Sequence, residues 1–479
     1  MMDKTKVIFG NTISPKVIIK ANKSKAKFIK KFGDDSKCVY HMSAEPNQTL
    51  LNLNVSNLVS SDTPLILPEK SIVIGNIRMG FGHYRIAIAF ASCANALGYK
   101  PLWFDLSGFP ESVGSKVIKH QNDLYSMGSR WSQKYKLFNK FFWEPLNSEG
   151  FRKIDYNAVD QKNSEIYIPM YNDFPKDIPF IGTHVWPSQG AIHSGLSQVI
   201  NAIPDNWPMA LHLAEGSIHT VQTPFAYLGY KLLNGMAKTT LLEMPKGSIY
   251  ETGYYIDHEL VSNIEVDTEA RLKRIQQNKP LRILLPVGGA GAGKDIFKCV
   301  LEYLMPFIKT RKVQLFINFG DHLNVWYYLK DAISDLDNLT EKYFDSYDKY
   351  QELVSNVDSL NGGIYAIYHK DIFEAVYSTN LIMRFMDLIV TKPSELSYYP
   401  IPKFFIKRVG GHEAYGAIHS SEMGDGTFEC DTLDKITMML SSLISNKEIL
   451  LSMNHNILKL NKINKYHGAY KVIELATKK

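Results

Sequence analysis

The feature that most constrains the fold is a pattern that occurs twice, in which a short apolar run leads through a glycine-rich turn into a helix. The first copy starts at residue 71 and reads SIVIG, NIRMGFG and HYRIAIAFASCANALGYK. The second copy starts at residue 281 and reads LRILLPV, GGAGAGK and DIFKCVLEYLMPFIK. Strand, turn, helix and next strand form the unit from which parallel sheets are built. We therefore expect an α/β protein with two Rossmann-like, doubly wound domains.

The segments after each copy continue the same alternation. In the first helix, Ile86, Phe90, Cys93 and Leu97 follow helical spacing, and Gly98 stands where a helix ends. PLWFDL then has the composition of the next strand. In the second half of the chain, further strands are expected at VQLFINFG, GIYAIYH, DLIVT and KFFIKRV. Both halves therefore predict a sheet covered by helices.

The expected division of the chain follows from these patterns and from its length. A chain of 479 residues is too long for one ordinary core. The charged stretch IEVDTEARLKRIQQNKP ends at a proline and is typical of a connection between domains. We expect an N-terminal extension of unclear structure (1–70), a first Rossmann-like domain (71–264), a linker (265–280), a second Rossmann-like domain (281–445) and C-terminal helices (446–479).

Composition excludes several classes of protein. Hydrophobic residues make up 45% and charged residues 21%, as in globular proteins. The net charge of +6 favours anionic partners, but dense Lys/Arg runs typical of nucleic-acid binders are not apparent, so no nucleic-acid partner is expected. The four cysteines have no CxxC spacing, which favours a reducing cytoplasm over a disulfide framework or a zinc site. No apolar run is long enough to cross a bilayer, although peripheral contact with a membrane stays open.

The second glycine-rich loop invites comparison with a phosphate-binding loop. Gly288, Gly293 and Lys294 satisfy its GxxxxGK part, but Asp295 stands where Ser or Thr would bind magnesium. A P-loop NTPase is therefore disfavoured. Neither glycine loop has the GxGxxG spacing, so NAD binding is unsupported. Either cluster taken alone could be a tight turn, while free backbone N–H groups at the start of a helix also suit phosphate.

A series of short motifs resembles the GT-B glycosyltransferases, particularly monogalactosyldiacylglycerol synthase and the bacterial lipid II N-acetylglucosaminyltransferase. In chain order these motifs are GFGHYR, PVGGAGAG, TGYYID, DLIVTKPSELS and VGGHEAYGA, and they span about residues 71–440. The resemblance implies two domains facing across a cleft. It also implies that the first domain binds mainly the acceptor and the second a nucleotide sugar, usually a UDP-sugar.

The resemblance also implies candidate donor-binding residues, which lie in both glycine loops, in TKPSELS and in VGGHEAYGA. They are Gly80, Gly82, Gly288, Gly289, Gly291, Lys392, Ser394, Ser397, His412 and Glu413. The chain departs from the family pattern at Ser394 and Glu395, where two glycines are usual. The acidic residue that contacts ribose in the family falls at Pro400, and the nearby prolines shorten the helix expected there. Binding of the donor is put in question by these departures.

Two histidines are candidates for the catalytic base that sugar transfer requires. His83 ends the first glycine loop, where the start of a helix lowers the pKa of an imidazole and keeps it neutral. The alternative is a histidine that caps its own helix. His184 ends the strand-like run IPFIGTH and is the second candidate, with an ordinary polar strand end as its alternative. Arg85, one turn into the helix, is expected on the surface.

Metal and cofactor binding are not expected. Lys392 and the second glycine loop can offset the charge of a leaving diphosphate, so neither a metal ion nor a cofactor beyond the nucleotide sugar is needed. His212, Glu215 and His219 lie within eight residues in HLAEGSIH. Their spacing fits no standard metal site, and a polar loop is the better interpretation.

A basic and aromatic stretch, residues 130–143, leaves two interpretations open. It reads RWSQKYKLFNKFFW, with lysines and an arginine between aromatic residues. Such a segment can dock on an anionic membrane, which would suit a lipid acceptor. It can equally be an amphipathic helix that buries its aromatic side chains in the domain.

The function predicted from the sequence is metal-independent glycosyl transfer from a nucleotide sugar to an unidentified acceptor, with a lipid among the candidates. The expected location is the cytoplasm, with a peripheral membrane position as an option. A nucleotide-sugar epimerase of similar fold is the enzymatic alternative. A non-catalytic sugar-nucleotide or lipid-binding protein is the alternative from another class, and Pro400 makes it credible.

Overall fold

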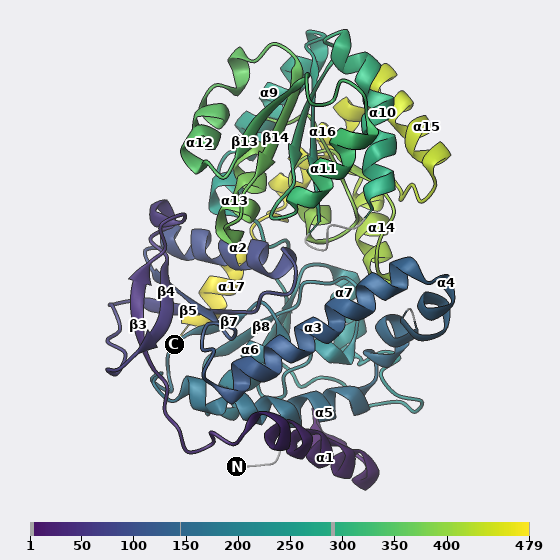
Figure 1. Ribbon diagram of the computed structural model, residues 1–479. Helices are drawn as coiled ribbons and strands as arrows, with labels where there is room; N and C mark the ends of the chain where they lie inside the picture. The colour runs from purple at the N-terminus through teal and green to yellow at the C-terminus, as the bar shows by residue number, and fades with distance from the viewer. Residues whose placement is uncertain (1–3, 144, 289–292, 479) are drawn as a thin grey trace.

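The structure, a computed structural model, describes residues 4–143, 145–288 and 293–478. Figure 1 shows two α/β domains, one above the other, each built on a sheet that helices cover. The first domain holds an eight-stranded sheet and the second a six-stranded sheet. The prediction of two Rossmann-like domains is confirmed. Among the described residues, no helix has the length and apolar character needed to cross a membrane.

The sheet of the first domain has the order β10-β9-β8-β7-β5-β6-β4-β3 and is parallel except for the edge pair β3 and β4. Its strands are β3 (His41–Pro46), β4 (Ser56–Ser61), β5 (Ser71–Asn76), β6 (Lys100–Asp105), β7 (Phe180–Gly182), β8 (Val199–Ala202), β9 (Ile218–Val221) and β10 (Ile249–Glu251). The central part of β5 is apolar, and its residues Ile72, Val73 and Ile74 are fully buried. A strand that is buried on both faces is mainly apolar, which is why the run SIVIG predicted a strand.

The first seventy residues belong to this domain, whereas the sequence suggested an extension of unclear structure. After a small hairpin of β1 (Val7–Ile8) and β2 (Asn11–Thr12), helix α1 (Pro15–Phe32) packs on the domain. Strand β4 then pairs in parallel with β6, with Ser56 opposite Leu102. Leu53, Val55 and Leu58 enter the cores on the two faces of the sheet. The strand HMSAEP at the sheet edge and its neighbour SNLVSS are largely polar and partly exposed, so they gave no clear strand pattern.

The sheet of the second domain is parallel throughout and has the order β13-β14-β12-β11-β15-β16. Its strands are β11 (Leu281–Pro286), β12 (Val313–Asn318), β13 (Thr340–Phe344), β14 (Gly363–Tyr368), β15 (Leu388–Thr391) and β16 (Lys403–Phe405). Five of these strands coincide with apolar runs of the sequence. Strand β13, TEKYF, is a half-exposed edge strand and was missed.

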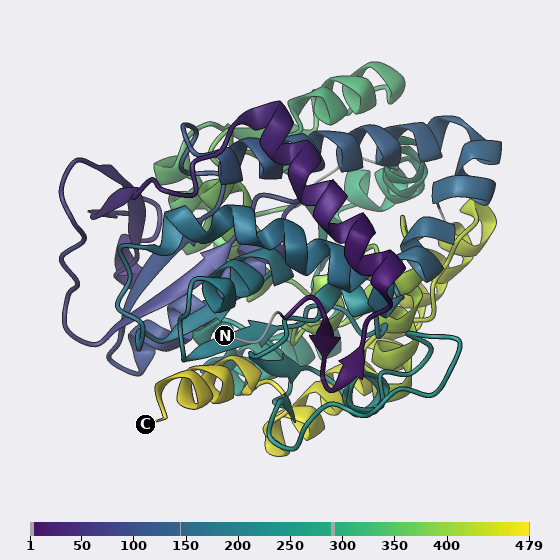
Figure 2. The ribbon, with the colours of Figure 1, turned by 90° about the horizontal axis from the view of Figure 1, so that it is seen from below.

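Helices cover both faces of each sheet, as Figures 1 and 2 show. In the first domain they are α2 (Gly82–Ala96), α3 (Val113–Lys134), α4 (Lys136–Phe138), α5 (Ile154–Ser164), α6 (Val185–His193) and α7 (Pro224–Lys231). The chain continues through α8 (His258–Val261), α9 (Ile264–Gln276), α10 (Lys294–Lys309), α11 (Leu323–Ala332), α12 (Tyr347–Ser355), α13 (Ile372–Met383), α14 (Ala414–Met423), α15 (Leu433–Ser445), α16 (Lys447–Lys462) and α17 (Gly468–Thr477). Helix α2 ends at Ala96, and Leu97 and Gly98 follow it. Gly98 has φ +80°, in agreement with the predicted helix end.

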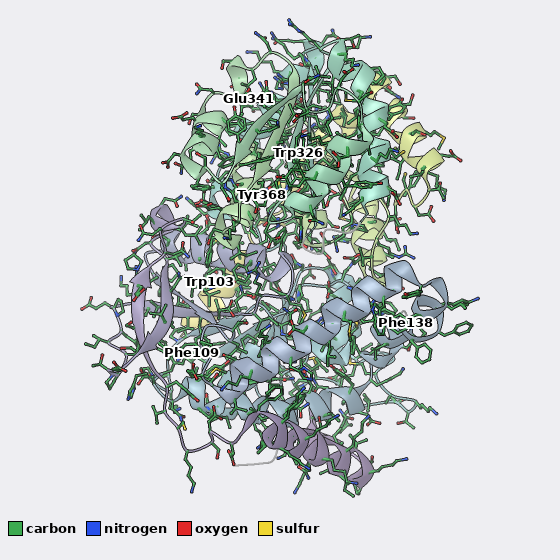
Figure 3. The ribbon with its side chains drawn as sticks, in the orientation of Figure 1. Trp103, Phe109, Phe138, Trp326, Glu341 and Tyr368 are labelled. Carbon is green, nitrogen blue, oxygen red and sulfur yellow. The ribbon has the colours of Figure 1, made fainter. Side chains whose placement is uncertain are left out.

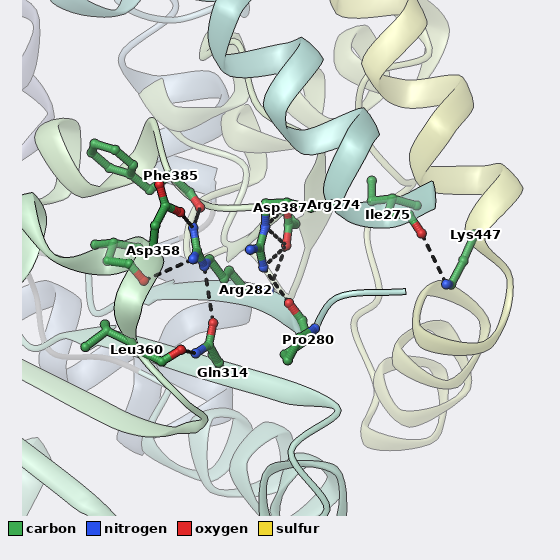
Figure 4. A network of polar contacts seen from close by, with 11 residues as sticks. Arg274, Ile275, Pro280, Arg282, Gln314, Asp358, Leu360, Phe385, Asp387 and Lys447 are labelled. Carbon is green, nitrogen blue, oxygen red and sulfur yellow. Dashed lines mark hydrogen bonds and ion pairs between the residues drawn. The ribbon is translucent and has the colours of Figure 1, made fainter. Parts of the chain in front are cut away.

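The charged stretch expected as a linker is helix α9, which is part of the second domain. The Arg274 guanidinium donates to the buried Asp387 carboxylate, and the same carboxylate accepts from the backbone N–H of Arg282 at the start of β11 (Figure 4). Arg282 in turn donates to Asp358 at 2.8 Å and Gln314 at 3.2 Å. The charges of this helix therefore anchor it to the sheet.

The chain passes between the domains at two places that lie side by side. It leaves the first domain around Tyr254 and returns at residues 463–467, so that α17 packs against α2. The Tyr254 N–H donates to the Lys465 carbonyl at 2.7 Å. Gly253 has φ +93°, and a Cβ on Gly468 would lie 2.2 Å from the Gly253 carbonyl oxygen. Only glycines allow the two passages to approach this closely.

Candidate active site

The loops that follow the strands of both sheets meet between the domains. The glycine-histidine loop after β5 reaches the second domain, where the Phe81 ring packs so tightly on Gly320 that a Cβ there would lie 2.4 Å from it. The Arg78 guanidinium pairs with Asp321 at 2.7 Å. Gly80 has φ +74°, a backbone conformation that glycine adopts without strain, and it turns the chain into α2. The carboxyl ends of parallel strands are where α/β proteins bind ligands, so this junction is the candidate site.

His83 lies half-buried at the start of α2, with its imidazole oriented by the backbone. Its Nδ1 is 2.7 Å from the Thr183 carbonyl oxygen. A carbonyl only accepts, so Nδ1 carries the hydrogen and Nε2 is the basic nitrogen of the neutral ring. Burial lowers the pKa of His83, although the bond to Thr183 and the charge of Asp205 oppose the shift. The ring is therefore neutral at physiological pH, with a defined nitrogen that can accept a proton.

His184 lies next to His83, with the two ring centroids 4.9 Å apart and the rings edge to face. It precedes α6, and its Nδ1 accepts a hydrogen bond from the Trp186 N–H at 3.2 Å. Burial, followed by the neighbouring His83, holds the pKa of His184 well below its ordinary value. Both candidate bases are thus neutral imidazoles, and they lie side by side beyond the ends of β5 and β7.

Asp205, which sequence reasoning missed, adds a carboxylate to this cluster. It lies just beyond β8, and its Oδ2 is 3.3 Å from His212 Nε2. His212 Nδ1 is 2.7 Å from the Tyr230 hydroxyl. Burial disfavours the ionised form of Asp205, but His212 and, from the other domain, His412 outweigh burial and lower its pKa. The first domain therefore presents an anion and two neutral imidazoles.

The residues of HLAEGSIH do not converge. Apart from His212, this segment holds Glu215, which accepts from the backbone N–H of Phe9 at 2.6 Å, and the buried His219 in β9. Within the described ranges, no group of three or more His, Cys, Asp and Glu side chains is arranged to hold a metal ion. The three residues His212, Glu215 and His219, which lie within eight positions of the sequence, thus have different surroundings in the structure.

In the second domain, Gly288, Lys392 and Glu413 lie together. The Lys392 side chain passes over Gly288, where a Cβ would be 3.5 Å from its Cε. Lys392 pairs with Glu413, whose other oxygen accepts from the N–H groups of Val409 at 2.7 Å and Gly410 at 3.2 Å. Burial opposes the charge of Lys392, but Glu413 outweighs it and raises the pKa of the lysine. Gly289 and Gly291 lie outside the described residues.

The region after TKP differs from what the resemblance implied. Ser394 precedes a short 3-10 helix, Glu395–Tyr398, so the expected shortening of the helix is confirmed. Ser397 is 2% exposed beneath α14, where a Cβ on Gly416 would lie 2.8 Å from its Oγ, so its hydroxyl faces a helix. The Pro400 carbonyl accepts from Arg271 at 3.0 Å inside the second domain. Glu395 instead reaches the first domain, 3.1 Å from the position of a Cβ on Gly82.

Arg85, expected on the surface, is buried between the domains at 2% exposure, and this expectation was wrong. Its guanidinium donates to the Glu395 carboxylate at 3.2 Å, to the Val376 carbonyl at 3.4 Å and to the Asn380 side chain. Helical spacing placed Arg85 on α2, but the second domain covers that face of the helix. No pattern within the first domain could signal this contact.

Asn380 extends the same polar network to the buried Asp257. The Asn380 amide donates to both Asp257 oxygens, at 3.0 and 3.1 Å, and the Tyr399 hydroxyl donates to one of them at 3.1 Å. Burial raises the pKa of Asp257 to about 7. The junction behind the glycine-histidine loop is therefore polar, buried and hydrogen-bonded.

An aromatic contact joins the domains beside His412 and Glu413. Tyr415 of α14 stacks on Trp207, with centroids 4.3 Å apart, and on Phe225, with centroids 5.3 Å apart. The Asn206 amide donates to the Tyr415 carbonyl at 3.0 Å. Trp207, on which Tyr415 stacks, also contacts the Arg152 guanidinium, which lies 4.4 Å from the centroid of the Trp207 ring. These rings fix α14 against the first domain close to the candidate site.

Two α/β domains, each built on a mainly parallel sheet and with loops that meet between them, have the arrangement expected of the GT-B type. Two protein-family models match the chain in succession: residues 7–232 match a "Domain of unknown function (DUF6937)" and residues 244–477 a "Domain of unknown function (DUF6938)". The boundary between the two matches falls before the passage at Tyr254. No curated protein matches the chain.

The solved structures to which this chain is similar come from several kinds of enzyme. The UDP-GlcNAc 2-epimerase from Neisseria meningitidis bound to UDP-GlcNAc is 12% identical, with a TM-score of 0.46, over 85% of this chain and 100% of that chain. The α,α-trehalose 6-phosphate synthase from Burkholderia multivorans is 10% identical, with a TM-score of 0.43, over 85% and 98%. The glycotransferase of kitacinnamycin is 11% identical, with a TM-score of 0.40, over 86% and 100%.

Proposed function

We propose that this protein is a metal-independent glycosyltransferase that moves a hexose from a nucleotide sugar, a UDP-sugar, to a hydroxyl group of a lipid acceptor. The proposal rests on one observation. His83, His184 and Asp205 of the first domain lie at the junction where this domain contacts the second. The order of motifs shared with monogalactosyldiacylglycerol synthase and the lipid II N-acetylglucosaminyltransferase supports the same function.

The reaction requires a base for the acceptor hydroxyl. We assign this function to His83, because its Nδ1 is committed to Thr183 and its Nε2 can take the proton as the acceptor oxygen attacks the anomeric carbon. Asp205 lies close enough to act on the pKa of His83 and would stabilise the imidazolium that forms. His184, with Nδ1 occupied by Trp186, orients the neighbouring ring.

The leaving diphosphate requires positive charge and N–H donors when the bond between the anomeric carbon and the phosphate oxygen breaks. Lys392 supplies the charge, since Glu413 keeps it protonated while about a third of its side chain stays exposed. Gly80 leaves room for close approach of the diphosphate to the backbone, since a Cβ there would meet no atom within 4 Å. Gly82, which faces Glu395, and Gly288, which faces Lys392, stay donor-binding candidates. We keep Ser394, Ser397 and His412 as donor-binding candidates together with Glu413.

A lipid acceptor is supported by the aromatic segment 130–143. Trp131, Phe141 and Phe142 are 48%, 62% and 69% exposed, while Trp143 is buried against Gly128 of α3. Figure 3 shows Phe138 of the same segment at the outer side of the first domain, away from its sheet. The burial of Trp143 fits the interpretation of the segment as part of the domain, while the exposed rings support our proposal that it contacts a membrane. Exposed aromatic rings next to lysines suit the surface of a membrane.

The proposal is tested by incubating the pure protein with radiolabelled UDP-, GDP- and dTDP-sugars, with and without membrane lipids. Label transfer to lipid and nucleotide release are followed together. His83→Ala should lower the rate of transfer by roughly 100- to 10,000-fold, the range for loss of a general base. His455→Ala, an exposed histidine of α16, is the matched control and should transfer at the wild-type rate.

The outcomes separate the candidate functions. Conversion of the donor to an epimer without any acceptor would identify an epimerase. Saturable nucleotide-sugar binding without turnover would identify a binding protein. Unchanged transfer by His83→Ala would refute the assignment of the base.

A further inference from the structure

The positive charge of this protein is concentrated in one helix. Helix α1 contains seven lysines and no acidic residue, so its formal charge is +7. The whole chain has 54 Lys and Arg against 48 Asp and Glu, a net charge of +6. All other residues together therefore carry a formal charge of −1. A helix that holds the entire positive excess marks a surface for an anionic partner.

Five of these lysines form a continuous stripe on the exposed side of α1. Their spacing alternates between four and three residues, which places them on one helical face: Lys16, Lys20, Lys23, Lys27 and Lys30. All five are exposed. The opposite side holds the helix on the domain through the buried Ala21 and through Phe28 and Phe32, which pack on the core beneath. Figure 2 shows α1 running along the outside of the domain.

The structure gives the stripe no function within the fold. Lys25, off the stripe, pairs with Glu165 at 2.7 Å, and Lys31 lies 3.1 Å from His120. In the described part of the chain, none of the five stripe lysines forms an ion pair with an acidic side chain. Like charges three or four residues apart destabilise a helix by about 0.2–0.5 kcal/mol per pair. The stripe thus weakens the helix that carries it, which points to an external partner.

We propose that the α1 stripe (Lys16, Lys20, Lys23, Lys27 and Lys30) is a docking site for membranes that contain anionic phospholipids. Ile19, three residues from Lys16, is 55% exposed on the same face. An exposed aliphatic side chain among lysines suits the boundary between lipid headgroups and acyl chains. Arginine, which favours bidentate contacts with nucleic-acid bases, is absent from the helix sequence. The site is independent of the proposed sugar transfer, since it needs neither donor nor acceptor.

Vesicle co-sedimentation tests the site on the full chain. Vesicles of phosphatidylcholine alone are compared with vesicles that also contain phosphatidylglycerol. The protein should bind the anionic vesicles selectively, and added salt should weaken binding. Each lysine near an anionic surface contributes about 1 kcal/mol, equivalent to about fivefold in the partition coefficient. Lys20→Gln with Lys27→Gln should therefore reduce binding by roughly 30-fold.

Three controls keep the result specific. Lys20→Arg with Lys27→Arg preserves the charge and should bind like the wild type. Lys349→Gln with Lys462→Gln removes two exposed charges from the second domain and should also leave binding unchanged. Circular dichroism verifies that each variant is folded. Unchanged binding of the glutamine variant, or equal binding to neutral vesicles, would overturn the proposal. Tighter lysine-dependent binding to a duplex oligonucleotide at the same salt would assign the stripe to nucleic acid instead.

Discussion

Replacing Glu395 by Gln tests whether the two domains are held together by the buried Arg85. The Arg85 side chain is 3% exposed and that of Glu395 is 16% exposed, and their ion pair links α2 to the second domain. Glutamine keeps the shape and one acceptor oxygen but removes the negative charge. The guanidinium then stays buried with neutral acceptors at Val376 and Asn380.

The expected loss of stability follows from these contacts. Removing one partner of a fully buried pair costs about 3–5 kcal/mol, mainly because the remaining charge is uncompensated. The neutral acceptors that remain and the partial exposure of Glu395 reduce this cost, and we expect Glu395→Gln to lower the free energy of unfolding by about 2–3 kcal/mol. The matched variant Glu302→Gln breaks an exposed pair with Lys298 at 3.7 Å and should cost less than about 1 kcal/mol.

Urea unfolding, followed by tryptophan fluorescence and far-UV circular dichroism, measures both variants. Arg85→Met should rescue Glu395→Gln in part, because an apolar side chain needs no counter-charge. The difference between the double variant and the sum of the single variants gives the coupling energy. If Glu395→Gln unfolds at the same urea concentration as Glu302→Gln, the reasoning from the buried charge is wrong.

Two further predictions concern pH. The pKa of His83 is lowered, so a reaction that uses His83 as its base should lose kcat/KM only below about pH 6.5 and keep a constant kcat/KM above it. An inflection of the pH profile above neutral pH would exclude His83 as the base. The pKa of Asp257 is raised to about 7. The native state therefore binds more protons than the unfolded state between about pH 4 and pH 7, and stability falls by up to about 4 kcal/mol as pH rises through this range. Asp257→Asn should remove that fall, so its loss of stability between about pH 5 and pH 8 should be smaller than that of the wild type.

The central strands and the helices next to them were predictable because their patterns are local. SIVIG and LRILLPV form strands that are buried on both faces of a sheet, so each is mainly apolar. Edge strands need no such run, and the edge strands β3 and β13 therefore escaped notice, as did β4, which is second from the edge and pairs with β6 at only two positions. The stretch that forms α9 was assigned to the linker, because Asp387, the partner of its Arg274, lies more than a hundred residues away in the sequence.

The candidate site was predictable where a residue follows a recognisable strand. His83 ends the glycine-rich loop that follows β5, His184 lies two residues beyond β7, and Lys392 comes directly after β15. Asp205 follows a short strand within a mixed segment, and only the pairing of β8 with β7 brings it to His212 and the two candidate bases. The burial of Arg85 depends on the other domain, which local periodicity does not describe.

The adjacent passages of the chain at Gly253 and Gly468 act as one pivot. Because the outgoing and returning segments are hydrogen-bonded to each other, both covalent connections between the domains lie at a single place. A relative rotation of the domains would therefore turn about this place and would have to break the contacts of Arg78, Arg85 and Tyr415 farther along the junction. A proteolytic cut in either segment would leave the other as an intact tether between the halves.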